Sequence, residues 1–377
     1  MSVVNKDTLT SFSDGRTGKS ATTMIDARYY TDPAIFELEQ EKIFAKTWQY
    51  ACPVSELPKV GSYKTFEIAG ENLFSIRGKD GQIRSFYNVC QHRAHRIVQG
   101  VGRTRSLVCP YHAWAYELDG ALRAAPNHEA VEGFELNKIC LTEVRTELFC
   151  GLVFVNLDSN AKSMAEVFPG VEAEIRSFVP HIDELAPMRW VPVPEKCNWK
   201  VSVENYSECY HCALNHPTFV NGVVDPDSYN VMPEGKVLRH YTKSAGLEKM
   251  SYEIDVDANE HALEYSSWYL WPTISFQVYP GNVLNTYHWY PQSVDSTMVW
   301  RGWYTIGGHR SDMIDQLADQ DYNTTVAEDI TLVESVQKGL SSRGFKPAPL
   351  VIDPKDGVNS EHSIRALNEW TLEALSS

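Results

Sequence analysis

The alternation of apolar and polar residues changes along this chain and predicts two kinds of structure. Residues 1–40 are mostly polar, with a helical pattern over 32–44. Beyond Trp48 the apolar residues come in short alternating stretches, and turn sequences such as Lys79-Asp80-Gly81 separate them. This pattern is typical of a small antiparallel β domain. The predicted strands are residues 62–68, 72–77, 84–88, 107–110, 115–118 and 151–157.

The second half of the chain combines helices with longer strands. The helices predicted there are residues 169–178, 199–212, 311–340 and 361–375. The strands predicted there are residues 266–279, 282–291 and 297–306. Strands followed by a long helix indicate an α+β fold in which the helix lies across an antiparallel sheet.

The length and composition are those of a globular protein with two domains. The 377 residues exceed what an electron-carrier domain needs, and 43% of them are hydrophobic and 22% charged. We expect a β domain at residues 45–160 and a second domain at 161–377. We expect residues 1–44 to form an N-terminal segment that packs on the second domain.

The sequence also indicates where the protein is located, which partners it can bind and what state its cysteines are in. The start of the sequence has no basic segment followed by an apolar core, and the longest apolar stretch, near residues 148–157, is about half a membrane span. We therefore expect a soluble, cytoplasmic protein without a membrane partner. The net charge of −15 argues against nucleic acid and mildly favours a cationic ligand. Outside the candidate metal sites, we expect buried free thiols at Cys52, Cys140, Cys150 and Cys197.

Two short loops each offer one cysteine and one histidine. They are Cys90-Gln91-His92 and, after 16 intervening residues, Cys109-Pro110-Tyr111-His112. This spacing is typical of a Rieske [2Fe–2S] cluster, in which two thiolates hold one iron and two imidazoles hold the other. A Cys2His2 zinc site is the second interpretation, although zinc loops usually pair ligands of one type. We expect the aromatic residues of 109–114 to shield the cluster and the hydroxyl of Tyr111 to bond a sulfur.

A second set of possible metal ligands lies in residues 204–217. Glu208 and His211 are three residues apart on a predicted helical face, and His216 follows five residues later. Two histidines so placed can bind one metal, and a facial triad for non-haem Fe(II) adds one carboxylate and leaves positions open for O2. The residues alone leave three candidates for that carboxylate: Glu204, Glu208 and the distant Asp329.

With both sites in the family's order, the chain resembles the α subunit of a Rieske non-haem iron oxygenase over essentially its full length. The two cluster loops carry the resemblance, with a Glu-Asn-Tyr-x-Glu-Cys-Tyr-His-Cys-x4-His block from residue 204 and a Glu-Asp-x4-Glu-x2-Gln-x-Gly-Leu block from residue 328. It implies a Rieske domain followed by a helix-grip (START-like) catalytic domain with a long C-terminal helix. It assigns Cys90, His92, Cys109 and His112 to the [2Fe–2S] cluster, and His211, His216 and Asp329 to a mononuclear non-haem iron.

Glu208 departs from the commonest family pattern, which has aspartate at this position. In the family that acid bridges a cluster histidine of one subunit and an iron-ligand histidine of the next. Glutamate there, with segments 332–340 and 360–362, resembles the quaternary-ammonium branch, of the carnitine monooxygenase and betaine demethylase type. The resemblance implies a homotrimer that hydroxylates a carbon beside the quaternary nitrogen of a small cationic substrate with O2, leading to N-demethylation or C–N cleavage. Because no dinucleotide-binding fingerprint is present, electrons would come from a separate flavin or iron–sulfur reductase.

A quaternary ammonium group is bound by aromatic faces, so the aromatic residues near the second site are substrate-binding candidates. They are Tyr206, Trp268, Trp271, Tyr279, Tyr287 and Trp289. Alternation along the strands puts only about half of the strand residues on one face. Two other functions remain open: an aromatic-acid ring-hydroxylating dioxygenase, and a Rieske electron carrier with a non-catalytic ligand-binding domain.

Overall fold

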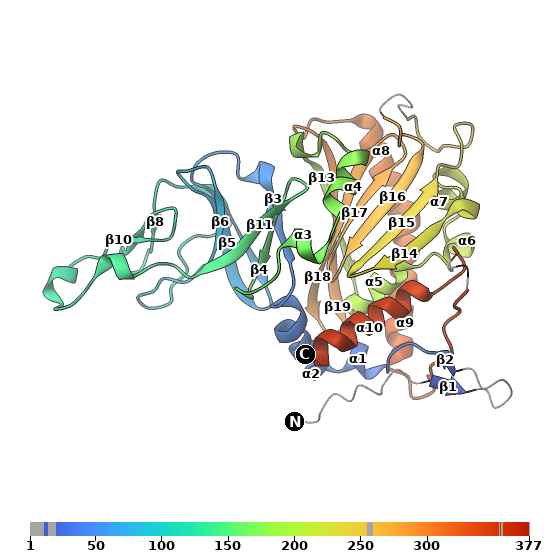
Figure 1. Ribbon diagram of the computed structural model, residues 1–377, viewed down its shortest axis with the longest axis horizontal. Helices are drawn as coiled ribbons and strands as arrows, with labels where there is room; N and C mark the ends of the chain where they lie inside the picture. The colour runs from blue at the N-terminus through green and yellow to red at the C-terminus, as the bar shows by residue number, and fades with distance from the viewer. Residues whose placement is uncertain (1–10, 14–19, 255–258, 354, 356, 377) are drawn as a thin grey trace. The chain divides into compact units, whose positions relative to one another are not determined.

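The computed structural model describes residues 11–13, 20–254, 259–353, 355 and 357–376, and the chain forms two compact units (Figure 1). Residues 44–164 make up the first, here called the β unit. Residues 1–43 together with 165–377 make up the second, here called the helix–sheet unit. Among the residues described, we find no helix with the length and apolar character that spanning a bilayer requires.

The β unit contains two antiparallel sheets that bury the cluster cysteines in its core. Its strands are β3 (Gln49–Pro53), β4 (Ser62–Ile68), β5 (Glu71–Arg77), β6 (Ile83–Tyr87), β7 (Val101–Arg103), β8 (Leu107–Val108), β9 (Ala115–Tyr116), β10 (Leu122–Ala124), β11 (Glu143–Phe149) and β12 (Leu152–Asn156). The larger sheet has the order β3-β12-β11-β6-β5-β4-β7, and the smaller has the order β10-β9-β8. Cys90 and Cys109 belong to the same buried cluster as Phe74 and Phe86. All six predicted strands are present, whereas β3, β7, β10 and β11 were not predicted.

The helix–sheet unit is built on one seven-stranded antiparallel sheet, which confirms the predicted α+β architecture. Its strands are β13 (Leu185–Glu195), β14 (Asn230–Glu234), β15 (Val237–Lys243), β16 (Glu264–Leu270), β17 (Ile274–Tyr279), β18 (Val283–Ser293) and β19 (Ser296–Ile306). Their order is β13-β19-β18-β17-β16-β15-β14, so the six later strands form a meander and β13 pairs with the last of them. A short hairpin of β1 (Ser11–Ser13) and β2 (Ser20–Thr22) stands apart from this sheet.

Helices cover both faces of this sheet (Figure 1). The helices of the described residues are α1 (Arg28–Thr31), α2 (Pro33–Glu39), α3 (Met164–Val167), α4 (Val171–Phe178), α5 (Trp199–Ser207), α6 (Cys212–Asn215), α7 (Pro217–Gly222), α8 (Asp312–Asp321), α9 (Ala327–Leu340) and α10 (His362–Ser376). On one face Trp268 donates a hydrogen bond to Glu174 of α4, 2.9 Å away. On the other, Tyr206 of α5 is hydrogen-bonded to Ser267, 2.7 Å away. Because successive residues of a strand point to opposite faces, α4 and α5 lie on opposite sides of the sheet.

The helix predicted at 311–340 is continuous but not uniform. A π-helical turn at Tyr322–Val326 separates α8 from α9. Single π turns inside helices occur frequently at functional sites, and α9 carries Asp329 just after this one.

Two predicted elements are wrong in extent. The helix expected at 199–212 ends at Ser207, because Glu208 is extended and its carboxylate accepts the backbone N–H groups of Tyr210 and His211. The strand expected at 266–279 is two strands, β16 and β17, which a turn at 271–273 joins. Three further strands of the sheet, β13, β14 and β15, were not predicted.

The cysteines follow the expectation in part. Cys52, Cys150 and Cys197 are buried free thiols, but Cys140 is free and exposed. It sits in an isolated bridge with Ala121 at the surface, where its apolar neighbours do not cover it. Cys209 and Cys212 are joined by a disulfide bond.

A network of buried charges joins the N-terminal helices to α5 and α10. Glu39 and Lys200 are 0% and 3% exposed; Lys200 donates to Glu39, as does the indole of Trp199 at 2.8 Å. One turn further along α5, the carboxylate of Glu204 accepts from Tyr30 and from Asn368, both at 2.6 Å. Burial raises the pKa of the Glu204 carboxyl to about 7. The network fixes α5, the helix that leads into the second metal-ligand segment.

Candidate active site

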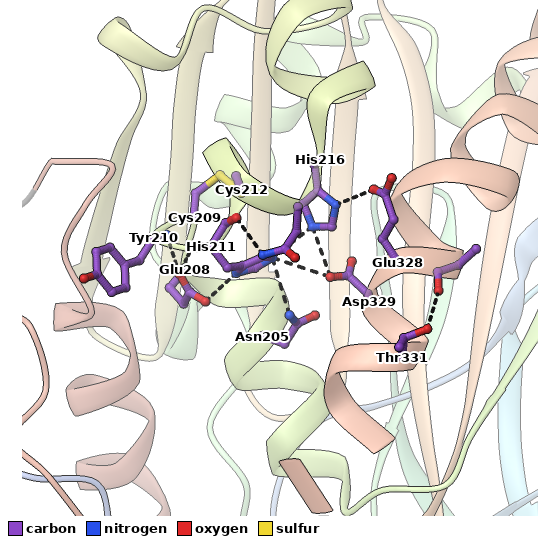
Figure 2. Close-up of polar contacts among 12 residues, drawn as sticks. Asn205, Glu208, Cys209, Tyr210, His211, Cys212, His216, Glu328, Asp329 and Thr331 are labelled. Atoms are coloured by element: carbon purple, nitrogen blue, oxygen red, sulfur yellow. Dashed lines mark hydrogen bonds and ion pairs between the residues drawn. A yellow bond between two sulfur atoms is a disulfide. The ribbon is translucent and has the colours of Figure 1, made fainter. Parts of the chain in front are cut away.

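The segment after α5 places two histidines beside a helix from much later in the chain. The side chain of Asn198 caps the start of α5 by accepting from the N–H of Lys200 at 3.1 Å. The extended Glu208 then turns the chain so that His211 precedes α6 and His216 lies between α6 and α7. Figure 2 shows both imidazoles facing Asp329 of α9.

Three ligand atoms converge on one point. The Nε2 atoms of His211 and His216 are 2.9 Å apart. Oδ1 of Asp329 is 3.5 Å from the first and 3.1 Å from the second. Three ligands at right angles on metal bonds of about 2.1 Å lie about 3 Å from one another. The three predicted iron ligands are therefore brought together at the spacing of a facial triad.

The outer nitrogens of the two rings fix the direction of the inner lone pairs. Nδ1 of His211 lies 2.5 Å from Glu208, and Nδ1 of His216 lies 2.8 Å from Glu328. A carboxylate can only accept, so each Nδ1 carries the proton and each Nε2 presents a lone pair. Oδ1 of Asp329 is buried and accepts no hydrogen bond within the described chain. Three electron pairs thus face one point, as the binding of a divalent metal requires.

The charges of the site agree with this interpretation. Burial raises the pKa of Asp329, but the two imidazoles beside it outweigh burial and lower it below its usual value. Burial lowers the pKa of His211, while the neighbouring carboxylates of Asp329 and Glu208 raise it to about 10, so a second proton on this ring, or a metal in its place, is favoured. The acids around the two imidazoles therefore favour a positive charge between them, and a divalent cation supplies one.

A pocket with a largely aromatic wall adjoins the three ligands. The space between its lining residues that is not filled by atoms, including the part open to solvent, is about 470 Å³. Besides Asn205, Asp329 and five residues within 208–216, its lining residues are Tyr206, Phe219, Tyr229, His240, Tyr265, Gln277, Tyr279, Tyr287 and Thr325. Burial lowers the pKa of His240 to about 3, so this ring is neutral. Among the described lining residues there is no lysine or arginine.

The structure places three of the six aromatic candidates in this wall. Tyr206, Tyr279 and Tyr287 line the pocket. Trp289 lies one layer further back, with its ring 5.0 Å from Tyr206 and its indole N–H donated to Ser202 at 2.8 Å.

The other two candidates lie away from the pocket. Trp268 points to the opposite face of the sheet, where it meets Glu174. Trp271 lies in the turn after β16, with the ammonium of Lys236 5.3 Å from its ring centroid.

Sequence reasoning missed several residues of the pocket. Phe219, Tyr229, His240 and Tyr265 line it without having been singled out. Alternation could have found Tyr265, because it faces the same side of β16 as Ser267, which bonds Tyr206. Glu328, which orients His216, was missed as well, although it immediately precedes Asp329.

In the β unit, the two cysteine–histidine loops have the same backbone form. In each loop the N–H of the cysteine donates to the carbonyl five residues later, His95 in one and Trp114 in the other. In each, an alanine four residues after the cysteine has a positive φ, 57° at Ala94 and 58° at Ala113. The repeated turn brings both cysteines into the core, 1% and 2% exposed. It brings the rings of His92 and His112 to 4.5 Å between centroids.

The residues around these loops shield and tune the predicted ligands. Trp114 stacks on His92 at 4.7 Å, and the ring of Tyr111 lies 3.7 Å from that of His112. The hydroxyl next to a sulfur is that of Tyr116, not Tyr111: it lies 3.3 Å from Sγ of Cys90. The Tyr116 oxygen also accepts from the N–H of Gln91. A cysteine thiolate that binds the cluster has no proton to donate, so the Tyr116 hydroxyl would be the donor to the sulfur.

Comparison with known proteins gives matches to both units. Residues 182–377 match the ring hydroxylating alpha subunit (catalytic domain) family, and residues 47–135 match the Rieske [2Fe-2S] domain. The chain is 35% identical over 343 residues to the carnitine monooxygenase oxygenase subunit of Escherichia coli (strain K12), with 90% of each chain covered. It is 34% identical over 200 residues to the glycine betaine monooxygenase oxygenase subunit of Chromohalobacter salexigens, covering 53% of this chain and 44% of that one.

A solved structure extends the similarity to the fold. The crystal structure of the quaternary ammonium Rieske monooxygenase CntA in complex with L-carnitine matches with a TM-score of 0.82 and 31% identity. The match covers 94% of this chain and 96% of that one.

Proposed function

Because the chain belongs to the family of Rieske-type ring-hydroxylating oxygenase α subunits, we propose that it is the terminal oxygenase of a monooxygenase acting on a quaternary ammonium compound. The family confirms a Rieske [2Fe–2S] cluster over the zinc interpretation, and it confirms an oxygenase with a mononuclear non-haem iron, O2 and a reductase partner. The alternative of a non-catalytic electron carrier is therefore wrong.

The aromatic wall beside His211, His216 and Asp329 is the observation that supports the substrate class. A quaternary ammonium group offers no hydrogen bond, and aromatic faces attract it by about 0.5–2 kcal/mol each. Four tyrosines of the wall, Tyr229, Tyr265, Tyr279 and Tyr287, come from three strands and the segment before β14.

A carboxylate, whether of an aromatic acid or of a betaine, meets no lysine or arginine in the described lining, and Arg301, behind Tyr287, is already paired with buried Asp321. What separates the two classes in this pocket is the aromatic wall, which attracts a quaternary ammonium group that an aromatic acid lacks. The relatives named for carnitine and glycine betaine support the same class.

When bound, the iron supplies the activation of O2 with two electrons from the reductase. One oxygen atom enters a C–H bond beside the quaternary nitrogen and the other leaves as water, with two protons taken up. The adduct then loses its O–H proton as the C–N bond breaks, which releases an aldehyde and a tertiary amine. The chain's part is to hold the cation against the tyrosines and to exclude water from the pocket.

We also propose a head-to-tail homotrimer in which Glu208 connects the two kinds of centre. Its carboxylate already bonds Nδ1 of His211 at 2.5 Å, which is one half of such a bridge. A structure of the related quaternary ammonium Rieske monooxygenase is described as giving insights into inter-subunit electron transfer. Cyclic heterologous contacts close a ring of subunits without a free end. The electron donor of this proposal is a flavin and iron–sulfur reductase.

The test is oxygen consumption with a reductase, NADH and a panel of carnitine, γ-butyrobetaine, glycine betaine, stachydrine and benzoates. We expect substrate-dependent formaldehyde or trimethylamine from a quaternary ammonium compound and none from benzoates. Formation of a cis-diol from an arene, with no turnover of any quaternary compound, would refute the substrate class.

A pair of variants tests the aromatic wall itself. Tyr265→Leu removes one face and should weaken substrate binding about 2- to 30-fold, the equivalent of one cation–π contact. Trp268→Phe, on the other face of the sheet, is the matched control and should bind as the wild type does.

A further inference from the structure

The disulfide between Cys209 and Cys212 lies in the wall of the active-site pocket, and the proposed reaction does not use it. The two Cα atoms are 4.9 Å apart, and the residues are 3% and 5% exposed. Both line the same pocket as His211 and Asp329. A ligand atom of Cys212 lies within 4.8 Å of ligand atoms of His211 and His216. The disulfide therefore lies beside the place where an oxidant formed at the metal centre would be released.

The bond has the characteristics of a redox-active pair rather than of a structural crosslink. It joins cysteines with only two residues between them, so it removes less freedom from the unfolded chain than a bond across a long loop. The Cys-x-x-Cys arrangement is typical of reactive disulfides. The four cysteines outside the cluster loops and this pair, Cys52, Cys140, Cys150 and Cys197, form no disulfide.

The residues enclosed by the bond are those that position the iron ligand and the proposed bridge (Figure 2). The ring formed by the disulfide contains Tyr210 and His211, whose backbone N–H groups both donate to the carboxylate of Glu208. The other oxygen of that carboxylate bonds Nδ1 of His211. While the ring is closed, both oxygens of Glu208 are held on its own loop.

We propose that Cys209 and Cys212 form a redox switch in which hydrogen peroxide closes the dithiol to the disulfide and the closed form slows electron delivery to the active site. The proposal rests on the proposed oxygenase function, because peroxide is the two-electron product released when O2 is reduced without substrate hydroxylation. One thiolate attacks peroxide to give a sulfenic acid and water, and the second thiol displaces the hydroxyl as water to give the disulfide. A dithiol reductant reverses the change by exchange and is itself oxidised to a disulfide.

The slowing follows from the position of Glu208. Opening the disulfide removes the covalent link across residues 209–212, so Tyr210 can turn and release the carboxylate oxygen it holds. That oxygen then becomes available to reach a partner outside its own loop. The closed form thus keeps the enzyme from drawing electrons while peroxide is present.

The experiment uses the holoenzyme, first reduced with dithiothreitol and then desalted. It is titrated with hydrogen peroxide, and the remaining free thiols are then alkylated. Mass spectrometry of the peptide that contains residues 209–212 detects the loss of two hydrogens when the disulfide forms. In parallel, pre-reduced enzyme is mixed with O2 and substrate, and reoxidation of the cluster is followed by absorbance, with iron and sulfide content measured in every sample. We expect the closed enzyme to react about tenfold more slowly and dithiothreitol to restore the rate.

Variants test whether the pair itself is responsible. In Cys212→Ser, peroxide should leave the rate of cluster reoxidation almost unchanged. In the control Cys140→Ser, peroxide should slow reoxidation as much as it does in the wild type. Thiols at 209 and 212 that stay open while peroxide slows the enzyme would overturn the proposal, as would a closed form that reacts at full rate. The mass measurement needs no substrate, so it tests the switch independently of the proposed function. If the proposed function is wrong, the reduced enzyme shows no turnover, which differs from both results that would overturn the switch.

Discussion

Glu328 is expected to set the iron affinity of the centre, although it is not a ligand itself. Its carboxylate accepts from Nδ1 of His216 at 2.8 Å, and the His216 side chain is 2% exposed while that of Glu328 is 34% exposed. Outer partners of metal-binding histidines typically contribute about 10- to 100-fold in metal affinity. Glu328→Gln keeps an acceptor for the Nδ1 proton but loses the charge, so we expect about 10-fold weaker binding. Glu328→Ala leaves the buried Nδ1–H of His216 without an acceptor, so we expect iron to bind about 100-fold more weakly, a loss of about 2.7 kcal/mol in binding free energy.

The assay is competition for Fe(II) with a chelator of known affinity under anaerobic conditions, with cluster content measured by absorbance. Glu334→Gln on the same helix is the control: that residue accepts from the backbone N–H of Lys196 at 3.3 Å and should leave iron affinity unchanged. Equal iron affinity in Glu328→Ala and the wild type would refute the argument that this hydrogen bond orients His216. A loss of cluster as well as of iron would point to a folding defect instead.

Three further predictions concern stability and the cluster. Glu39→Ala leaves Lys200 buried without its partner and should cost about 3–5 kcal/mol in the free energy of unfolding, measured in urea; Glu39→Ala with Lys200→Met should recover most of the loss. Burial raises the pKa of Glu204 to about 7, so between about pH 4.5 and 7 the folded state keeps a proton that the unfolded state releases. The free energy of unfolding should therefore fall by up to about 3 kcal/mol as the pH rises through this range. Glu204→Gln should abolish that slope, and an unchanged pH profile of urea unfolding would contradict it. Tyr116→Phe removes the hydroxyl 3.3 Å from Sγ of Cys90. Because a hydrogen bond of about 0.5–1.5 kcal/mol stabilises the reduced cluster, the variant should lower the reduction potential of the cluster by about 20–60 mV. Redox titration measures this potential, and Tyr111→Phe is the control.

The local patterns were sufficient for the metal-ligand segments. Each cluster loop contains its cysteine and histidine within four residues, so the spacing alone indicates the geometry. Asp329 is different, because no periodicity relates it to His211 and only the family resemblance selected it from three acids. The structure brings it to within 3.5 Å of both histidines because α9 packs against α5, a contact that no pattern in the sequence indicates.

The sheet of the second unit shows why prediction stopped where it did. Strand β13 contains Pro187, Pro192 and Pro194, which argue against a strand in sequence. It lies at the edge of the sheet, where a missing N–H costs no ladder hydrogen bond, and its only neighbour is β19. In β16 every residue after Glu264 is buried on one face or the other, so composition does not show that Tyr265 faces the pocket and Trp268 faces α4.

The ligands of the mononuclear centre come from segments more than a hundred residues apart, on a loop after α5 and on α9. The unfolded chain cannot present them together, so ferrous ion binds the native state alone. Free Fe(II) at about a thousand times its dissociation constant would add about 4 kcal/mol to the free energy of unfolding. Scarcity of Fe(II) should therefore have two effects in a cell. It lowers the catalytic rate, and it lowers the amount of the protein because more of the chain is unfolded and degraded by proteases.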